Sequence, residues 1–140
     1  YGPRGLLQHQ CALPMAAGLD AVAEMLRESQ RAGEASFLTV LKVFGDMPSP
    51  GLLSFPRPGF TLTLDYANSG TSTLRLLDRL DEIVIAAGGA INPYKDARMS
   101  PRTFEASFPR WRELEALRDP AFSSTFWRRV TRGLATDGRD

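Results

Sequence analysis

Residues 60–66, FTLTLDY, carry the strictest pattern in the chain. Four apolar side chains alternate with three polar ones, and the polar ones are Thr61, Thr63 and Asp65. Successive side chains of a β-strand point to opposite sides, so this alternation predicts a strand with one apolar face and one polar face. An antiparallel sheet that is covered by helices on a single face accommodates such a strand.

Three other segments are predicted to join it as strands. GLLQHQCA at residues 5–12 alternates shortly before a proline, and SFLTVLKVFG at residues 36–45 is rich in β-branched and aromatic residues. AINPYK at residues 90–95 follows two glycines and supplies a short fourth strand. Together with residues 60–66, these segments make a four-stranded sheet.

Two helices are predicted between the strands. Leu19, Val22 and Leu26 recur at helical spacing within residues 15–32, and Gly33 follows as a stop signal. The second helix precedes Gly88, and its apolar residues at helical spacing are Leu74, Leu77, Leu80, Val84 and Ala87.

The resulting order, β-α-β-β-α-β, is that of the ferredoxin-like α+β fold, in which two helices cover one face of a four-stranded antiparallel sheet. Beyond Ser100 the sequence becomes helical, which predicts extra C-terminal helices. A chain of 140 residues with 43% hydrophobic content suits one domain. We assign residues 1–134 to this domain and residues 135–140 to a loose tail.

The composition argues against several classes of function. A net charge of +1 gives no overall attraction to nucleic acid or to an anionic membrane. The arginines of FWRRVTRG, residues 126–133, are interpreted as the solvated side of an amphipathic helix. One cysteine and one histidine exclude an internal disulfide and predict no metal site. No apolar run approaches a membrane span and no signal peptide is visible, so a cytoplasmic protein is predicted.

The period of two also predicts which side chains share the open face of the sheet. If the polar sets of the strands lie together, this face carries Gln8, Gln10, Lys42, Thr61, Thr63 and Asp65. The simplest interpretation is a solvated sheet face. Solvated faces in this chain should, however, be rich in Arg and Glu. Short hydrogen-bonding side chains beside a lysine favour the wall of a ligand site instead.

Lys95 is one of only two lysines among 17 cationic side chains, and Lys42 is the other. The ammonium of a lysine is a compact charge, which suits it to stabilising a small localised negative charge, whereas arginine is a flat and permanently charged fork. Chance usage in an arginine-rich chain is the alternative explanation for both lysines.

Several of these segments resemble one family of enzymes. SFLTVLKVFG, LLSFPRPGFTLTLDY, YKDARMSPRTFEASFPR and FSSTFWRRV are together similar to the C-terminal half of FAD-linked oxidases of the vanillyl-alcohol oxidase superfamily. The decaprenylphosphoryl-ribose oxidase branch is the nearest, and the sugar-lactone oxidases are more distant. The similarity runs in order from about Leu6 to about Leu134.

The resemblance implies a cap domain that lies over a flavin and shapes the substrate pocket, while an N-terminal domain absent from this chain binds most of the FAD. It implies hydride transfer to the flavin from a secondary alcohol of a sugar or sugar lactone, and an inactive isolated fragment. The chain also lacks an initiator methionine, which predicts a piece of a longer protein. The alcohol, the electron acceptor and any oligomer are left open.

Roles of single residues follow from the resemblance by position. It assigns substrate binding to Gln8, Gln10, Lys42, Thr61 and Thr63. It puts Gln10 and Lys95 beside the flavin and makes Lys95 the catalytic residue, because an ammonium there favours the negative charge of the reduced flavin. Thr61 and Thr63 stand where the nearest branch has Asn and Cys, and His9 stands where it has an aromatic residue.

A second function class stays open at this point. A stand-alone ferredoxin-like module without flavin could use the same open face to bind a small ligand or to dimerise. The two classes differ in whether a flavin-binding domain of roughly two hundred residues precedes Tyr1 in the encoded protein.

Overall fold

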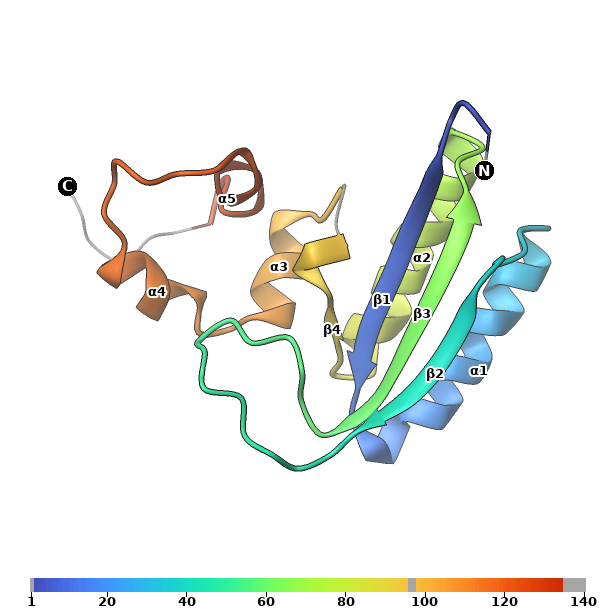
Figure 1. Cartoon of the computed structure of the whole chain (residues 1–140), viewed down its shortest axis with the longest axis horizontal. Coiled ribbons are helices and arrows are strands. Elements are labelled where there is room, and N and C mark those ends of the chain that lie inside the picture. The colour runs from blue at the N-terminus through green and yellow to red at the C-terminus, as the bar shows by residue number, and fades with distance from the viewer. Residues whose placement is uncertain (1, 96–97, 135–140) are drawn as a thin grey trace.

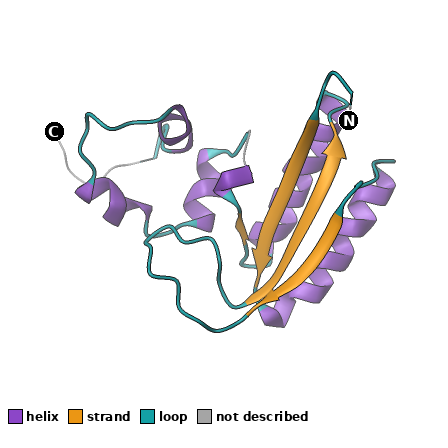
Figure 2. Cartoon of the chain, viewed as in Figure 1, coloured by secondary structure: helices purple, strands orange, loops and turns teal. Residues whose placement is uncertain are grey.

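A computed structural model of the chain describes residues 2–95 and 98–134 (Figure 1). The elements occur in the order β1 (Leu6–Leu13), α1 (Met15–Arg31), β2 (Thr39–Phe44), β3 (Gly59–Ala67), α2 (Thr71–Ala86), β4 (Ala90–Ile91), a 3₁₀ turn (Pro93–Lys95), α3 (Pro101–Ser107), α4 (Trp111–Leu117) and α5 (Thr125–Val130). The described chain thus mixes strands and helices, as predicted (Figure 2). The predicted tail at residues 135–140 lies outside the described residues.

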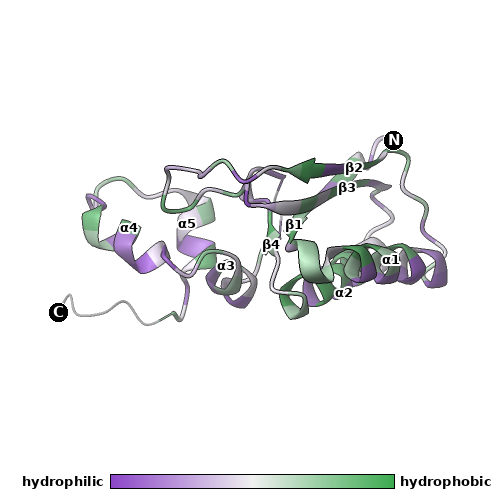
Figure 3. Ribbon diagram, turned by 90° about the horizontal axis from the view of Figure 1, so that it is seen from below, coloured by the Kyte–Doolittle hydropathy of each residue, from purple (hydrophilic) through white to green (hydrophobic). Residues whose placement is uncertain are grey.

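The four strands form one antiparallel sheet with the order β2-β3-β1-β4. The helices α1 and α2 lie side by side on one face of this sheet, and α3, α4 and α5 continue beyond β4 (Figures 1 and 3). None of the described helices combines the length and the apolar character needed to cross a membrane.

The fourth strand is shorter than the six residues that the sequence predicted. Only Ala90 and Ile91 pair with β1, and Pro93–Lys95 form the 3₁₀ turn instead. Pro93 has no N–H to donate to a ladder. In addition, the side-chain oxygen of Asn92 accepts a hydrogen bond from the Tyr94 N–H at 2.9 Å, which bends the chain into a turn. Lys95 therefore lies on a turn beside the sheet and not in a strand.

The apolar side of β3 faces the helices, as its alternation predicted. Leu62, Leu64 and Tyr66 are all buried in the core between the sheet and the two helices. The Tyr66 hydroxyl and the Ser29 hydroxyl of α1 share a hydrogen bond of 2.5 Å, so even the polar end of this ring is satisfied inside the protein.

The buried side of α1 is not the side predicted from the spacing of its leucines. Leu19 and Leu26 are 59% and 42% exposed, and only Val22 of the three spaced residues is buried. Gly18 and Ser29 lie on the buried side of the helix. Gly18 is needed there because a Cβ at this position would stand 2.4 Å from the Phe60 ring of β3.

The C-terminal helices are joined to the sheet through aromatic packing. The ring of Phe104 lies at the centre of this cluster, and its partners are Phe108, Trp111, Phe126 and Trp127. The cluster is anchored to β4, because the Ile91 N–H donates to the Ser107 hydroxyl at 3.1 Å. The predicted extra helices thus belong to the same core as the sheet.

Candidate functional site

The two central strands bring polar side chains together on the sheet face opposite α1 and α2. Gln8 donates from Nε2 to Asp65 Oδ1 at 2.6 Å, and Gln10 donates from Nε2 to Thr61 Oγ1 at 3.2 Å. Thr61 and Asp65 are only 2% and 6% exposed, so they are not the solvated side chains of a simple open face. Each glutamine amide is instead held in place by a neighbour on β3.

Asn92 fixes the orientation of Gln10 and was not singled out by the sequence. Its Nδ2 donates to Gln10 Oε1 at 2.6 Å, and its backbone N–H donates to the Gln10 carbonyl at 2.8 Å. Because Gln10 Oε1 accepts from Asn92, the amide must point its NH₂ group toward Thr61. The Asn-Pro pair signalled a turn in the sequence, but nothing in it identified the partner, which lies 82 positions away.

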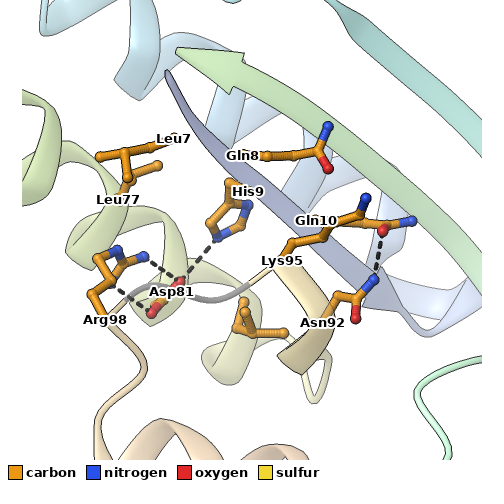
Figure 4. Close-up of a pocket in the computed structure, with 10 residues that line it drawn as sticks. Leu7, Gln8, His9, Gln10, Leu77, Asp81, Asn92, Lys95 and Arg98 are labelled. Atoms are coloured by element: carbon orange, nitrogen blue, oxygen red, sulfur yellow. Dashed lines mark hydrogen bonds and ion pairs between the residues drawn. The ribbon is translucent and has the colours of Figure 1, made fainter. Parts of the chain in front are cut away.

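Lys95 ends the turn that Asn92 begins. Its backbone N–H donates to the Asn92 carbonyl at 3.3 Å, and its side chain is exposed. The side chain borders a small hollow together with both glutamines (Figure 4). The full lining of this hollow is Leu7, Gln8, His9, Gln10, Leu77, Asp81, Ile91, Asn92, Lys95 and Arg98.

The hollow beside Lys95 has a volume of about 20 Å³, which is room for about one water molecule. The structure brings Gln8, Gln10 and Lys95 to its lining, whereas Lys42, Thr61 and Thr63 do not line it. Lys42 lies on the edge strand β2 directly opposite Thr61, and Thr63 lies opposite Gln10. The predicted site residues on the strands therefore share one face but not one cavity, and Lys95 lies on the turn beside that face.

Beneath the glutamines, the buried carboxylate of Asp81 supports the floor of this hollow. His9 points to the helix side of β1, and its Nε2 lies 3.0 Å from Asp81 Oδ1 of α2. Arg98 reaches the same carboxylate from the segment after the Lys95 turn, at 3.0 Å (Figure 4). Asp81 thus links β1 and α2 to the stretch that carries Lys95.

Asp81 was missed by the sequence interpretation. Asp81 falls within the apolar spacing of the second helix, next to Leu80, and no local pattern distinguishes it from a surface carboxylate. Burial opposes its charge, but the hydrogen bond from His9 and the charges of His9 and Arg98 outweigh this effect. The pKa of Asp81 is accordingly held below its usual value.

Asp81→Asn is expected to lower the free energy of unfolding at pH 7 by about 2 kcal/mol, because it removes charged hydrogen bonds in a buried position. The folded pKa of Asp81 is depressed, so its stabilisation is present above the ordinary value of 3.8 and is lost as the pH falls through the lower folded value. The variant should therefore lose stability less steeply than wild type below pH 4. Urea unfolding between pH 3 and pH 7 measures both effects.

Asp78→Asn is the matched control for this prediction. Asp78 also pairs with Arg98, at 2.7 Å, but its side chain is 67% exposed. Its removal should change the free energy of unfolding by no more than about 0.5 kcal/mol. Equal losses in the two variants would contradict the structural role given to Asp81.

A second and larger hollow lies on the helix side, between α2 and α3. It has a volume of about 510 Å³, and it shares only Asp81 and Arg98 with the hollow beside Lys95. Its lining is Asp78, Asp81, Glu82, Ile85, Ala86, Arg98, Ser100, Arg102 and Thr103. None of the sequence-predicted site residues contributes to it.

Comparison with known proteins yields relatives that are much longer than this chain. No protein-family model matches the chain. A Streptomyces coelicolor protein, described as an uncharacterised protein in the mprA 5′ region, is 37% identical over 131 residues, which cover 90% of this chain and 35% of the relative. The decaprenylphosphoryl-β-D-ribose oxidase of Mycolicibacterium smegmatis is 33% identical over 135 residues, which cover 93% of this chain and 29% of the relative. The chain spans about a third of the length of these curated relatives.

Proposed function

We propose that this chain is the substrate-binding cap domain of an FAD-dependent oxidoreductase that oxidises a secondary alcohol of a sugar or sugar lactone. The observation that carries the proposal is the similarity to a named oxidase over 93% of the chain. The domain, ferredoxin-like by our inference, extends over residues 1–134. Its FAD-binding partner domain belongs to the remainder of a longer encoded protein.

The donor groups around Lys95 fit one border of a flavin and its substrate. Each glutamine amide donates one N–H to a side chain of β3, and its second N–H can donate to a ligand. The hollow of about 20 Å³ is far too small for a flavin ring or a sugar, so a second wall is required. This need supports a site completed by another domain.

The roles proposed for the side chains follow from their chemistry. FAD, when bound, supplies the acceptor for the hydride that leaves the alcohol carbon. The ammonium of Lys95 stabilises negative charge that develops next to it, and Gln8 and Gln10 orient polar groups of the ligand. Gln10 also borders the cofactor. Lys42 and Thr63 contact the more distant part of the substrate along the same sheet face. Thr61 is buried and acts on the substrate site through its hydrogen bond with Gln10.

The FAD content of two samples tests this proposal. The full-length encoded protein should show the absorption bands of bound flavin, whereas the 140-residue chain should be folded and colourless. Titration of the 140-residue chain with FAD should give a dissociation constant weaker than about 1 μM, equivalent to about 8 kcal/mol of binding free energy.

Two outcomes would count against the proposal. A full-length protein that neither retains nor binds FAD would favour the stand-alone binding module without flavin. Sub-micromolar binding of FAD by the 140-residue chain would contradict the division of the site between two domains.

A further inference from the structure

One edge of the sheet has no neighbouring strand among the described residues. Of the two edge strands, β4 has only two residues and is covered by Ser107 of α3. β2 has six residues, TVLKVF, and no strand of the described chain pairs with its outer side. The unpaired backbone groups of a long apolar edge strand can bond to another strand, and natural proteins usually prevent this with charges, prolines or bulges. Lys42 is the single charge in β2.

The side of β2 that faces the helix layer is also uncovered. Leu41 lies directly opposite Leu62 of β3, and Val43 lies opposite Phe60. Leu62 is 1% exposed, whereas Leu41 and Val43 are 47% and 61% exposed. The helix layer therefore covers Leu62 of β3 but leaves Leu41 and Val43 of β2 exposed.

Two leucines of α1, Leu19 and Leu26, are exposed as well. Leu19 and Leu26 are seven positions apart and so lie on nearly one line along the helix. Glu28, two positions after Leu26, lies on the opposite side of α1 and pairs with Arg79 of α2 at 2.6 Å. The leucines consequently lie on the side of α1 away from α2. Of the two helices on the sheet, α1 is the one nearer to β2 (Figures 1 and 3).

We name the exposed apolar side chains of β2 and α1 together the β2–α1 edge. Its members are Met15, Leu19, Leu26, Leu41 and Val43, each between 42% and 61% exposed. It combines unpaired backbone groups of a strand with apolar side chains from two layers. This is the surface that a further strand with its own helix would bury by extending both layers.

We propose that the β2–α1 edge is the docking surface for a strand-and-helix unit of the same encoded polypeptide, outside these 140 residues. The relatives are long enough to contain such a unit, because the part that matches this chain is only 35% and 29% of their length. The added strand would place apolar side chains over Leu41 and Val43, and an acidic or polar side chain next to Lys42 on the other face. The proposal does not depend on flavin.

The charge of β2 argues against a second copy of the chain as the occupant. Symmetric antiparallel pairing of two β2 strands about their centre would put the two Lys42 side chains on one sheet face, directly opposite or diagonal to each other. Like charges at these positions repel. A strand from elsewhere in the same polypeptide has no such restriction.

Hydrogen exchange at the β2 amides tests the proposal. In the 140-residue chain, the alternate N–H groups that point away from β3 should exchange rapidly. In the full-length encoded protein the same amides should exchange at least about 100-fold more slowly, because they are paired in the interior of a larger sheet. Equal rates in the two proteins would overturn the proposal. Protection that appears in the 140-residue chain only at high concentration would also overturn it, in favour of a second copy.

Leu41→Glu provides an independent measurement. In the 140-residue chain, where Leu41 is half exposed, the melting temperature should change by no more than about 1 °C, whereas it should fall by at least about 3 °C in the full-length protein. Leu117→Glu, at a 78% exposed position of α4, is the matched control. Tolerance of Leu41→Glu in both proteins would refute the docking surface. FAD absorption recorded on the same samples reports separately on the proposed enzymatic function.

Discussion

Lys95→Met in the full-length protein is expected to slow reduction of its flavin by about 100- to 1,000-fold, the effect of removing one preorganised electrostatic donor. The proposed enzyme gains negative charge on its cofactor during the reaction, and methionine keeps the length of the side chain without the ammonium. Lys95 is exposed on a turn, so the melting temperature should stay within about 1 °C of wild type. Anaerobic single-turnover reduction by an accepted alcohol and a melting curve measure the two quantities.

Lys95→Arg separates a specific role from a general positive charge. The guanidinium is wider than an ammonium and cannot occupy the same space against a ring, so this variant should also be impaired. A solvated lysine would tolerate both substitutions. Near wild-type reduction in both variants would remove Lys95 from the site, and a loss of stability without a loss of rate would make it a structural residue.

Gly59→Ala is expected to lower the free energy of unfolding by at least about 3 kcal/mol, because it combines backbone strain with a collision. Gly59 opens β3 with φ of +139°, a conformation that residues with a side chain rarely adopt. A Cβ there would stand 2.0 Å from the Leu13 carbonyl oxygen of β1. That oxygen belongs to the backbone at the end of a strand and cannot swing aside. Urea unfolding of the 140-residue chain measures the loss.

Gly45→Ala is the control at the other end of the same loop. No φ in the left-handed region is found at Gly45, and a Cβ there would have nothing within 4 Å. The free energy of unfolding should change by no more than about 0.5 kcal/mol. Similar unfolding midpoints for the two alanine variants would show that the approach of β3 to β1 is looser than described here.

The strands could be predicted from the sequence because their pattern is local. Alternation at residues 60–66 identified β3 and the side that faces the core, and the same period put Gln8 and Gln10 on the polar face with Thr61. The phase of α1 could not be predicted in this way. Its inner side combines the apolar Ala21, Val22 and Met25 with a glycine that admits the Phe60 ring and a serine that bonds to Tyr66, and the last two carry no apolar signal.

The candidate site was predictable only in part, for a related reason. Side chains on paired strands are positioned by register, so Gln10 and Thr61 could be brought together by counting residues. Asn92 and Asp81 act through contacts that are 82 and 72 positions apart in the sequence. Such contacts depend on how α2 and the Lys95 turn pack against β1, and no single-sequence pattern records this packing.

The pairing of the two central strands sets the order in which the nascent chain can fold. Leu13 pairs with Phe60 and Leu6 with Ala67, which are 47 and 61 positions apart. During synthesis, β1 therefore cannot pair with β3 until α1, β2 and the loop after β2 have also been made. Long-range pairing of this kind makes folding slow and leaves an apolar strand exposed in the meantime. Until β3 has been synthesised, β1 therefore has no strand to pair with among the residues that precede it.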